Sequence, residues 1–474
     1  MTRGQLRGMN HDDLKNWSKR AADWTHDYHS TLRDRPVRAQ TKPGEIAAKL
    51  PAAPPETAEP MEEIFADFER IVPDGMTHWQ HPRFFAYFPA NASPASMLAE
   101  QLANSIASNC MIWQASPAAT EIEQVTTDWL RQALGLPDSF TGTIHDSATV
   151  ATLSAVITMR DRASGWRSVD EGLTGQRLRI YASAQTHSSV DKAVRLAGIG
   201  QRNLVKIDTD ADYRMDPDKL DAAIRDDIFN DRTPAGVVLC TGGTSIGAFD
   251  PISECIEVAR AHRLYTHVDA AWAGSAMICP EFRTLWQGAE GADSIVFNPH
   301  KWLGAQFDCS VQFLADPAPQ IRSLGLRPDY LQTLGEEEIV NFNEWTVPLG
   351  RRFRALKLWF VLRAYGLDNL RTRIRNHVAW IEELTETFRA TPGFEITTEP
   401  RLALFSFRYA PDGGDADALT ERLLEKVNAD GRIYLTQTRH KGKFVIRVTA
   451  GSFDCTRDDV MAVHAVVTEL AATL

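Results

Sequence analysis

Short apolar segments alternate with amphipathic helical segments through the middle of the chain. Four of the apolar segments are LRIYASA (178–184), GVVLCT (236–241), LYTHVDA (264–270) and DSIVFN (293–298). Segments with helical periodicity lie between the first three, at 187–198, 216–229 and 251–263. Strands that alternate with helices form βαβ units, and a parallel sheet covered on both faces has continuous apolar strands. The pattern therefore predicts an α/β fold with a mostly parallel central sheet.

One further apolar segment breaks this alternation. CSVQFLA (309–315) follows DSIVFN closely, without a helical segment between them. A connection between parallel strands needs a crossover of a dozen or more residues, whereas antiparallel strands can be joined by a short one. We therefore expect these two strands to pair antiparallel.

The N-terminal part of the chain has a pattern of its own. Its apolar residues recur at spacings of three and four, and they are Leu14, Trp17, Ala21, Trp24, Tyr28 and Leu32. This periodicity predicts an amphipathic helix. The Pro-rich segment at 41–60 follows it and cannot form a regular element. The helix has no nearby core, so we expect it to pack against a second subunit, with folding back onto its own domain as the alternative.

The C-terminal part predicts a second, smaller domain. A helical segment at 351–366 leads to strand-like segments at 403–410 and 444–450, which flank a helical segment at 416–430. Chains longer than roughly 250–300 residues usually divide into domains. We expect an N-terminal helical segment at 1–85, a large domain at 86–362 and a small α+β domain at 363–474.

Composition narrows the class of protein. The formal net charge of −11 argues against a nucleic-acid or an anionic-membrane partner. The N-terminus has no signal-peptide core, and no apolar segment reaches the ~18 residues of a membrane span. The six cysteines show no CxxC spacing, which is typical of reduced core thiols. We expect a cytoplasmic enzyme without a metal site.

Polar residues follow several of the predicted strands at their carboxyl ends, where open α/β sheets bind ligands. They are His187, Thr241 to Ser245, Asp269, Asn298, His300 and Lys301. Each has an ordinary structural explanation: a helix start, a turn, a helix cap or a solvated loop charge. Together they would place an acid, an amine, an imidazole and phosphate-sized loops along one edge of the sheet, as in an active site.

The combination fits the chemistry of pyridoxal 5'-phosphate. A lysine amine forms a Schiff base with a carbonyl, and a desolvated pocket makes the neutral amine available. The cofactor also needs an acid beside its pyridine nitrogen and a phosphate site. Ser147 and Thr149 open a helical segment at 146–159, and free backbone N–H groups at a helix start favour an anion.

Two long segments, HVDAAWAGSAMICPEFR (267–283) and ADSIVFNPHKWLGAQFDCS (292–310), closely resemble the aromatic-L-amino-acid decarboxylases. These are group II pyridoxal-phosphate decarboxylases of aminotransferase-like fold (fold type I), and the likeness suggests a bacterial-type member. It extends over nearly the whole chain. Further matching segments are RPV (35–37), HWQHPRFFAYFPA (78–90), WQASPAATEIE (113–123), THSSVDKA (186–193) and PLGRRFRALKLWF (348–360).

The resemblance implies a role for each matching position. The catalytic set would be Lys301, which carries the cofactor, Asp269 at the pyridine nitrogen, His187 stacked on the ring, and Tyr330 as proton donor to the substrate carbon. The other cofactor contacts would be Ser147, Ala148, Thr149, Thr244, Ala271, Asn298, His300 and Gly350. The substrate's aromatic ring would lie against Trp79, Tyr87, Phe88 and Pro89, with His187 nearby. The family's mobile loop enters the partner's site, which implies a homodimer.

The chain also departs from the family pattern. Asp146, Thr149 and Val150 differ from the usual phosphate segment, and Trp272 replaces a common tyrosine. The implied reaction is decarboxylation of an aromatic L-amino acid (Trp, Phe, Tyr or dopa) to its amine. The alternatives are an aromatic aldehyde synthase, which carries phenylalanine at the Tyr330 position, a decarboxylase of a non-aromatic amino acid, an aminotransferase, and a non-enzymatic scaffold.

Overall fold

The computed structural model describes residues 9–326 and 339–474, and its large domain is built on one sheet of seven strands in the order β1-β7-β6-β5-β4-β2-β3. The strands are β1 (Thr141–His145), β2 (Leu178–Ser183), β3 (Leu204–Ile207), β4 (Thr233–Cys240), β5 (Tyr265–Asp269), β6 (Ser294–Phe297) and β7 (Ser310–Leu314). Pairing is parallel from β3 through β6, and β7 is antiparallel to both β6 and β1. The predicted α/β fold and the antiparallel pair are confirmed. β1 and β3 were not predicted.

Helices cover both faces of this sheet, because successive strand residues point to opposite sides. On β4, Val238 packs with α5 (Ala148–Ala163) and α7 (Ser188–Leu196). Its neighbours Val237 and Leu239 pack in the other cluster, with α8 (Pro217–Phe229) and α9 (Ile252–Ala261). Further helices of this domain are α3 (Pro94–Ile106), α4 (Pro117–Leu134), α6 (Arg167–Glu171), α10 (Pro299–Trp302) and α11 (Ala318–Leu324). The sheet is thus buried on both faces, as its apolar strands predict.

The C-terminal domain is a four-stranded antiparallel sheet with helices packed on it. Its strands, in the order β10-β11-β9-β8, are β8 (Phe394–Arg401), β9 (Leu404–Tyr409), β10 (Thr436–His440) and β11 (Lys443–Thr449). Its helices are α13 (Ala416–Asp430), α14 (Arg457–Ala471) and the second part of α12 (Arg354–Arg389), which is interrupted by a non-helical Gly366. The predicted α+β character is confirmed, while the domain limits 1–85, 86–362 and 363–474 stay a prediction.

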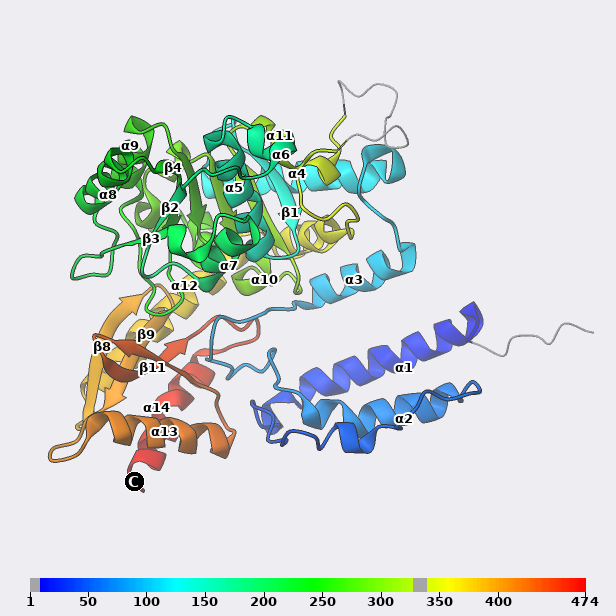
Figure 1. Ribbon diagram of the computed structural model, residues 1–474. Coiled ribbons are helices and arrows are strands. Elements are labelled where there is room, and N and C mark those ends of the chain that lie inside the picture. The colour runs from blue at the N-terminus through cyan, green and yellow to red at the C-terminus, as the bar shows by residue number, and fades with distance from the viewer. Residues whose placement is uncertain (1–8, 327–338) are drawn as a thin grey trace, which may run out of the picture.

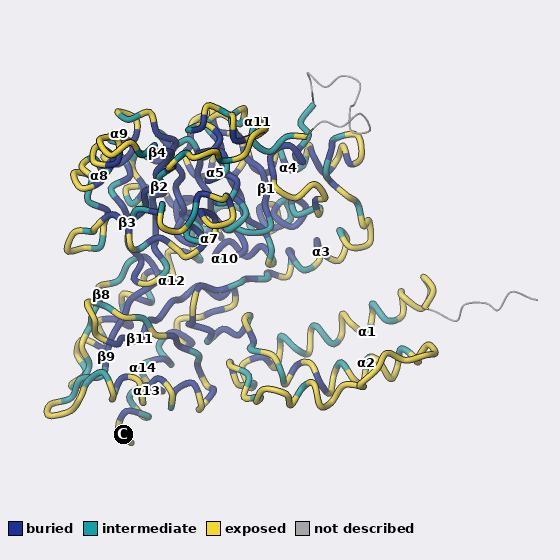
Figure 2. Tube along the Cα trace, in the orientation of Figure 1, coloured by how far each residue is buried: buried dark blue, intermediate teal, exposed yellow. Residues whose placement is uncertain are grey.

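The N-terminal helices α1 (His11–Ser30) and α2 (Met61–Ile71) lie side by side, away from the two domains (Figure 1). The predicted aromatic stripe of α1 packs against α2, with ring centroids 5.4 Å apart for Trp17–Phe65 and 4.8 Å apart for Trp24–Phe68. No residue of α1 is buried, and Figure 2 shows α1 exposed or intermediate along its length, in contrast to the sheet. This pair of helices therefore leaves much surface uncovered in the single chain.

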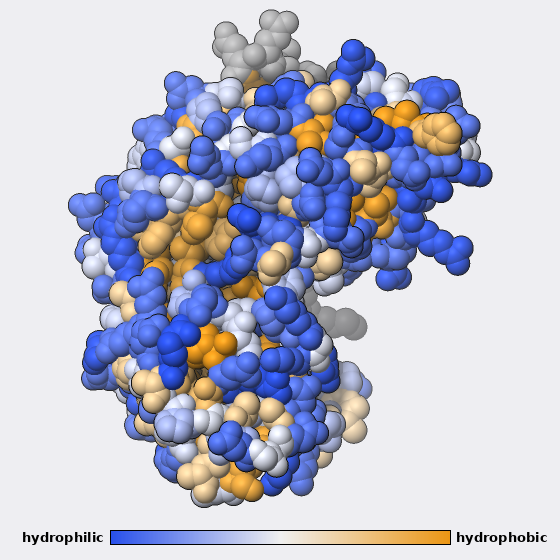
Figure 3. Space-filling view, turned by 90° about the vertical axis from the view of Figure 1, so that its left-hand side faces the viewer, coloured by the Kyte–Doolittle hydropathy of each residue, from blue (hydrophilic) through white to orange (hydrophobic). Residues whose placement is uncertain are grey.

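The polarity of the surface and the state of the cysteines are those expected from the composition. A side view shows a largely hydrophilic surface, with hydrophobic side chains gathered between the upper and lower parts of the molecule (Figure 3). All six cysteines are buried and unpaired. None of the helices that the structure describes is long and apolar enough to cross a membrane.

Candidate active site

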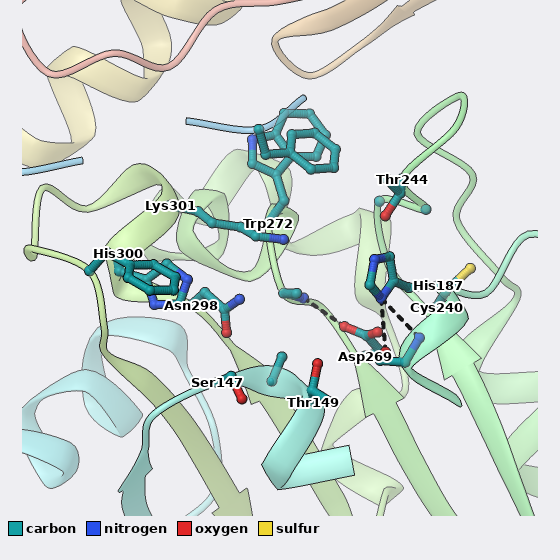
Figure 4. A pocket seen from close by; sticks show the side chains of 17 residues that line it. Ser147, Thr149, His187, Cys240, Thr244, Asp269, Trp272, Asn298, His300 and Lys301 are labelled. Atoms are coloured by element: carbon teal, nitrogen blue, oxygen red, sulfur yellow. Dashed lines mark hydrogen bonds between the residues drawn. The ribbon is translucent and has the colours of Figure 1, made fainter. Parts of the chain in front are cut away.

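A cavity of about 320 Å³ opens at the carboxyl ends of β4, β5 and β6 (Figure 4). Most of the predicted cofactor residues line it, and they are Ser147, Ala148, Thr149, His187, Thr244, Asp269, Ala271, Asn298, His300 and Lys301. Lys301 comes from the one-turn helix α10 after β6, Asp269 ends β5, and His187 precedes α7. The fold thus brings together residues that are far apart in the sequence.

The amine of Lys301 is held in a poorly solvated site. Its Nζ lies 5.1 Å from the ring centroid of Phe88. Desolvation lowers the pKa of Lys301 from 10.5 to about 8; the negative charge of Asp269 opposes this shift and the positive charge of Arg447 adds to it. An amine with a pKa near 8 is available in its neutral, nucleophilic form near neutral pH.

Asp269 and His187 lie on the other side of the cavity (Figure 4). Asp269 is buried, and its Oδ1 accepts the backbone N–H of Ala271 at 3.0 Å. His187 Nδ1 accepts the backbone N–H of Ser189 at 3.1 Å, so the neutral ring carries its proton on Nε2. Burial lowers the pKa of His187, which favours this neutral form, although the charge of Asp269 acts against it.

A further part of the cavity wall is formed by hydroxyl groups at the start of α5 and by His300. Ser147 caps α5, where its Oγ accepts the backbone N–H of Val150 and donates to Asp146 Oδ1 at 2.8 Å. His300 Nδ1 accepts the backbone N–H of Cys309 at 3.0 Å. Burial lowers the pKa of His300 to about 3, so the ring is neutral and offers Nε2–H as a donor. The His300 Nε2–H and the backbone N–H groups at the start of α5 suit an anion such as a phosphate.

The residues of this cavity fit pyridoxal 5'-phosphate. They supply an amine, a carboxylate, an imidazole and phosphate donors within one site, and the volume lies at the lower end of about 300–1,000 Å³ for ligand pockets. Asn298 is buried, and its Oδ1 has no hydrogen-bond partner within the described chain, as expected of a group that contacts a ligand. Among all residues that the structure describes, no group of three or more His, Cys, Asp or Glu could hold a metal ion.

A second cavity, of about 680 Å³, adjoins the first. Both are lined by Phe88, His300, Lys301 and Phe307, so Lys301 lies where the two meet. The predicted wall residues Trp79, Phe88 and Pro89 line this second cavity together with small and apolar residues and the amides of Gln80, Asn91 and Gln306. We call the first the polar cavity and the second the aromatic cavity. The two meet at Lys301.

Three predicted site residues lie outside both cavities or outside the described chain. Tyr87 is 48% exposed and lines neither cavity; it stacks on Trp79, with centroids 5.8 Å apart. Gly350 is exposed and also lines neither, and a Cβ built on it would meet only Asn109, at 3.8 Å. Tyr330 lies outside the residues that the structure describes.

Trp272 and Phe307 line the site and Arg447 contacts its wall, although the sequence assigns none of them a role there. Trp272 is 1% exposed and stacks between Phe88, at 4.5 Å, and Trp302, at 5.0 Å. Phe307 lies in an irregular segment after α10, where no periodicity marks it. Arg447, which had no assigned role, is buried; its guanidinium lies 5.2 Å from the Phe88 centroid and donates to the carbonyl of Tyr87 at 3.2 Å. It connects β11 with the aromatic wall.

Comparison with known proteins identifies the family. Residues 43–410 match the pyridoxal-dependent decarboxylase conserved domain. The chain is 36% identical to tryptophan decarboxylase 2 of Oryza sativa subsp. japonica, covering 94% of this chain and 92% of that protein. It is also 36% identical to phenylacetaldehyde synthase of Arabidopsis thaliana, covering 94% and 93%. The crystal structure of Oryza sativa TDC with PLP and tryptamine superposes with a TM-score of 0.95 at 35% identity, over 99% of both chains.

All three are plant proteins, so they give no support to the expectation of a bacterial-type member. They do confirm the fold type I architecture and the cofactor that the cavity fits. The chain belongs to the pyridoxal-dependent decarboxylase family and is a decarboxylase that uses pyridoxal 5'-phosphate.

Proposed function

We propose that this enzyme decarboxylates an aromatic L-amino acid, of the Trp, Phe, Tyr and dopa class, to the corresponding arylalkylamine and CO2. The observation that carries the proposal is the place of Lys301, where the polar cavity with Asp269 and His187 meets the aromatic cavity. The polar part suits the cofactor, and the aromatic part suits the side chain of the substrate. The two relatives described above are named for tryptophan and for phenylacetaldehyde, both of which carry an aromatic ring.

The residues of the polar cavity divide the work of holding the cofactor. Lys301 would bind it covalently, Asp269 would pair with its pyridine nitrogen, and His187 and Ala271 would lie beside its ring. Ser147, Ala148, Thr149, Thr244, Asn298 and His300 would hold its phosphate. When bound, pyridoxal phosphate supplies an electron sink for the bond that joins the substrate's Cα to its carboxylate.

The aromatic cavity decides the class of substrate. Within the described chain its apolar wall is formed by Trp79, Phe88, Pro89, Met97 and Phe307, and the uncharged amides of Gln80, Asn91 and Gln306 also line it. Among the described residues, Lys301 is the one Lys or Arg that lines it, and the His300 ring beside it is neutral. An acidic side chain such as that of glutamate would find no free cation among these described residues, whereas an aromatic ring would bury its apolar surface. We therefore propose an aromatic rather than an acidic substrate.

The substrate carbon must receive a proton after CO2 leaves. We assign this step to Tyr330, with His187 as assistant, because the neutral His187 ring carries its proton on Nε2 at the edge of the cavity. A positioned acid of this kind typically contributes about 10²–10⁴-fold to the rate.

An assay of the products tests this assignment. Wild type should release CO2 and amine in equal amounts under anaerobic conditions from at least one of Trp, Phe, Tyr and dopa. Tyr330→Phe should lower amine yield by about 10²-fold or more, because the proton donor is lost, and should shift the product in air toward aldehyde, ammonia and peroxide. Tyr409→Phe, in β9 of the C-terminal domain, is the control.

The outcomes separate the alternatives. Keto acid without CO2 would indicate an aminotransferase, and CO2 from acidic amino acids alone would refute the aromatic assignment. Aldehyde from the wild type would favour the aldehyde synthase, a possibility that the similarity to phenylacetaldehyde synthase keeps open. Unchanged amine yield without peroxide in Tyr330→Phe would refute the role of Tyr330.

We also propose that the enzyme is a homodimer. On α3, Leu98, Leu102 and Ile106 recur every four residues, and each is at least 43% exposed. Leu14 of α1 and Ile64 of α2 are exposed as well, so all three helices leave large apolar side chains uncovered in the single chain. A homodimer would also explain the exposure of Gly350, if it acts in the partner's site. Sedimentation should give twice the chain mass of 52.9 kDa, and a monomer at micromolar concentration would contradict the proposal.

The cellular location is a separate proposal. Six buried, unpaired cysteines fit a reducing compartment, so we propose that the enzyme is cytoplasmic. Cell fractionation that places it in an oxidising compartment would overturn this.

A further inference from the structure

Asn91 lies between the aromatic cavity and α10, the helix that carries Lys301. It is 1% exposed and lines the aromatic cavity. Its backbone N–H donates to the carbonyl of His300 at 2.7 Å. Its side-chain Nδ2 donates to the carbonyl of Lys301, and also to that of Gly451 at 2.8 Å. One residue therefore connects the wall of the aromatic cavity, the lysine and the C-terminal domain.

These hydrogen bonds give partners to backbone carbonyl groups of α10. The last carbonyl groups of a helix have no partner within the helix, and a helix of only four residues is not stable by itself. Asn91 supplies donors to two consecutive carbonyls of α10, those of His300 and Lys301. The direction in which the Lys301 side chain leaves the backbone is therefore fixed from outside the helix.

Asn91 is itself held firmly from two sides. The Gln80 amide donates to the carbonyl of Ala90 and accepts the N–H of Ala92 at 2.8 Å, so it clamps the segment that contains Asn91. On the other side, a Cβ on Gly451 would lie 2.6 Å from Pro89 Cγ. Only a glycine lets the backbone approach Pro89 this closely and present its carbonyl to Asn91.

We propose that Asn91 is a positioning residue for the decarboxylation: its amide fixes Lys301 relative to the aromatic wall that holds the substrate's ring. The proposal rests on the assignment of Lys301 as the lysine that binds the cofactor. Because the same residue belongs to the wall and bonds to the lysine, a shift of the wall is transmitted to the amine.

The amide, and not merely the size of the side chain, carries this role. Both partners of Nδ2 are carbonyl oxygens, and Oδ1 is buried without a hydrogen-bond partner in the described chain. An aspartate has the same shape, but its carboxylate would face the two carbonyl oxygens and could donate to neither. Asn91→Asp therefore removes the hydrogen bonds without opening a cavity but adds a buried negative charge, whereas Asn91→Ser weakens the same hydrogen bonds without adding a charge.

The test compares Asn91→Asp with a matched control, Asn428→Asp. Asn428 is also a buried amide that joins two backbone groups, the N–H and carbonyl of Leu435, each at 3.1 Å, but it lies in the C-terminal domain. Asn91→Asp should lower kcat by about 100-fold with little change in KM, as expected when a reacting group is misplaced by about 1 Å. The pH titration of the bound cofactor's visible absorbance should also move by about one pH unit, a tenfold change in the ratio of the two forms.

The control should lower Tm yet keep the kcat and the absorbance titration of wild type. Wild-type values in Asn91→Asp, or equal changes in both variants, would overturn the proposal. If Asn91→Asp does not fold, Asn91→Ser, which keeps one donor, should give a smaller loss of the same kind, and wild-type values in Asn91→Ser would again overturn it. Borohydride reduction of the wild type and peptide mapping provide the separate check: a label away from Lys301 would refute the proposed function itself.

Discussion

Replacing Lys301 with alanine is expected to abolish turnover, with kcat reduced by about 10⁴-fold or more, a loss of about 5.5 kcal/mol of transition-state stabilisation. The variant should also lack the visible absorbance of a covalently bound cofactor. Lys301 is the only amine that lines the polar cavity within the described chain, so no neighbouring lysine can replace it. Lys219→Ala, on the exposed side of α8, is the control and should keep both properties.

The pH dependence of the amine gives a second measurement of the same prediction. In the cofactor-free protein, modification of Lys301 by an amine-selective reagent should increase with pH with a midpoint of about 8, well below the ordinary lysine value near 10.5. Between these values the folded chain binds fewer protons at Lys301 than the unfolded chain does. This group therefore makes the free energy of unfolding rise with pH across that window. A midpoint near 10.5 for Lys301 would show that its site is well solvated and would remove the physical basis of its assignment.

The sequence allowed the sheet to be predicted where its strands were long and apolar. β2, β4, β5, β6 and β7 each coincide with a predicted apolar segment. β3 was missed because LVKI has only four residues, two of them partly or fully exposed, and β1 because TGTIH contains little apolar surface. In both strands the pairing with neighbours, rather than the local pattern, determines the structure.

Some residues of the candidate site could likewise be predicted from the sequence, and others could not. Lys301, Asp269 and His187 could be found because parallel strands deliver their carboxyl ends to one edge. The contact of Asn91 with Lys301 joins residues 210 positions apart, and no hydrophobic periodicity in the sequence indicates it. Tyr87 belongs to the predicted aromatic wall, but in the structure it stacks on Trp79 and lines neither cavity, a difference that only side-chain packing decides.

Replacing Asp269 with asparagine is expected to lower kcat by about 10²–10³-fold, the usual effect of removing one preorganised electrostatic group from an active site. Asparagine has the same shape, and its Oδ1 can still accept the N–H of Ala271, so the change removes a charge and little else. Without that charge, a protonated pyridine nitrogen loses its partner in a poorly solvated site. The electron sink on which the loss of CO2 depends is then weaker.

The same substitution has an effect on Lys301 that can be measured without turnover. The charge of Asp269 raises the pKa of Lys301, so its removal should move the midpoint of amine modification in the cofactor-free protein below 8. Asp227→Asn provides the matched control, since Asp227 is a buried carboxylate of α8 that pairs with Arg179 and Arg232 outside the site. It should lower Tm and leave both kcat per folded molecule and the Lys301 midpoint unchanged. A charge that acts on the cofactor's nitrogen must also act on the lysine across the same cavity. A loss of activity in Asp269→Asn without a shift of the Lys301 midpoint would therefore show that the carboxylate is too far from the amine to share a site with it.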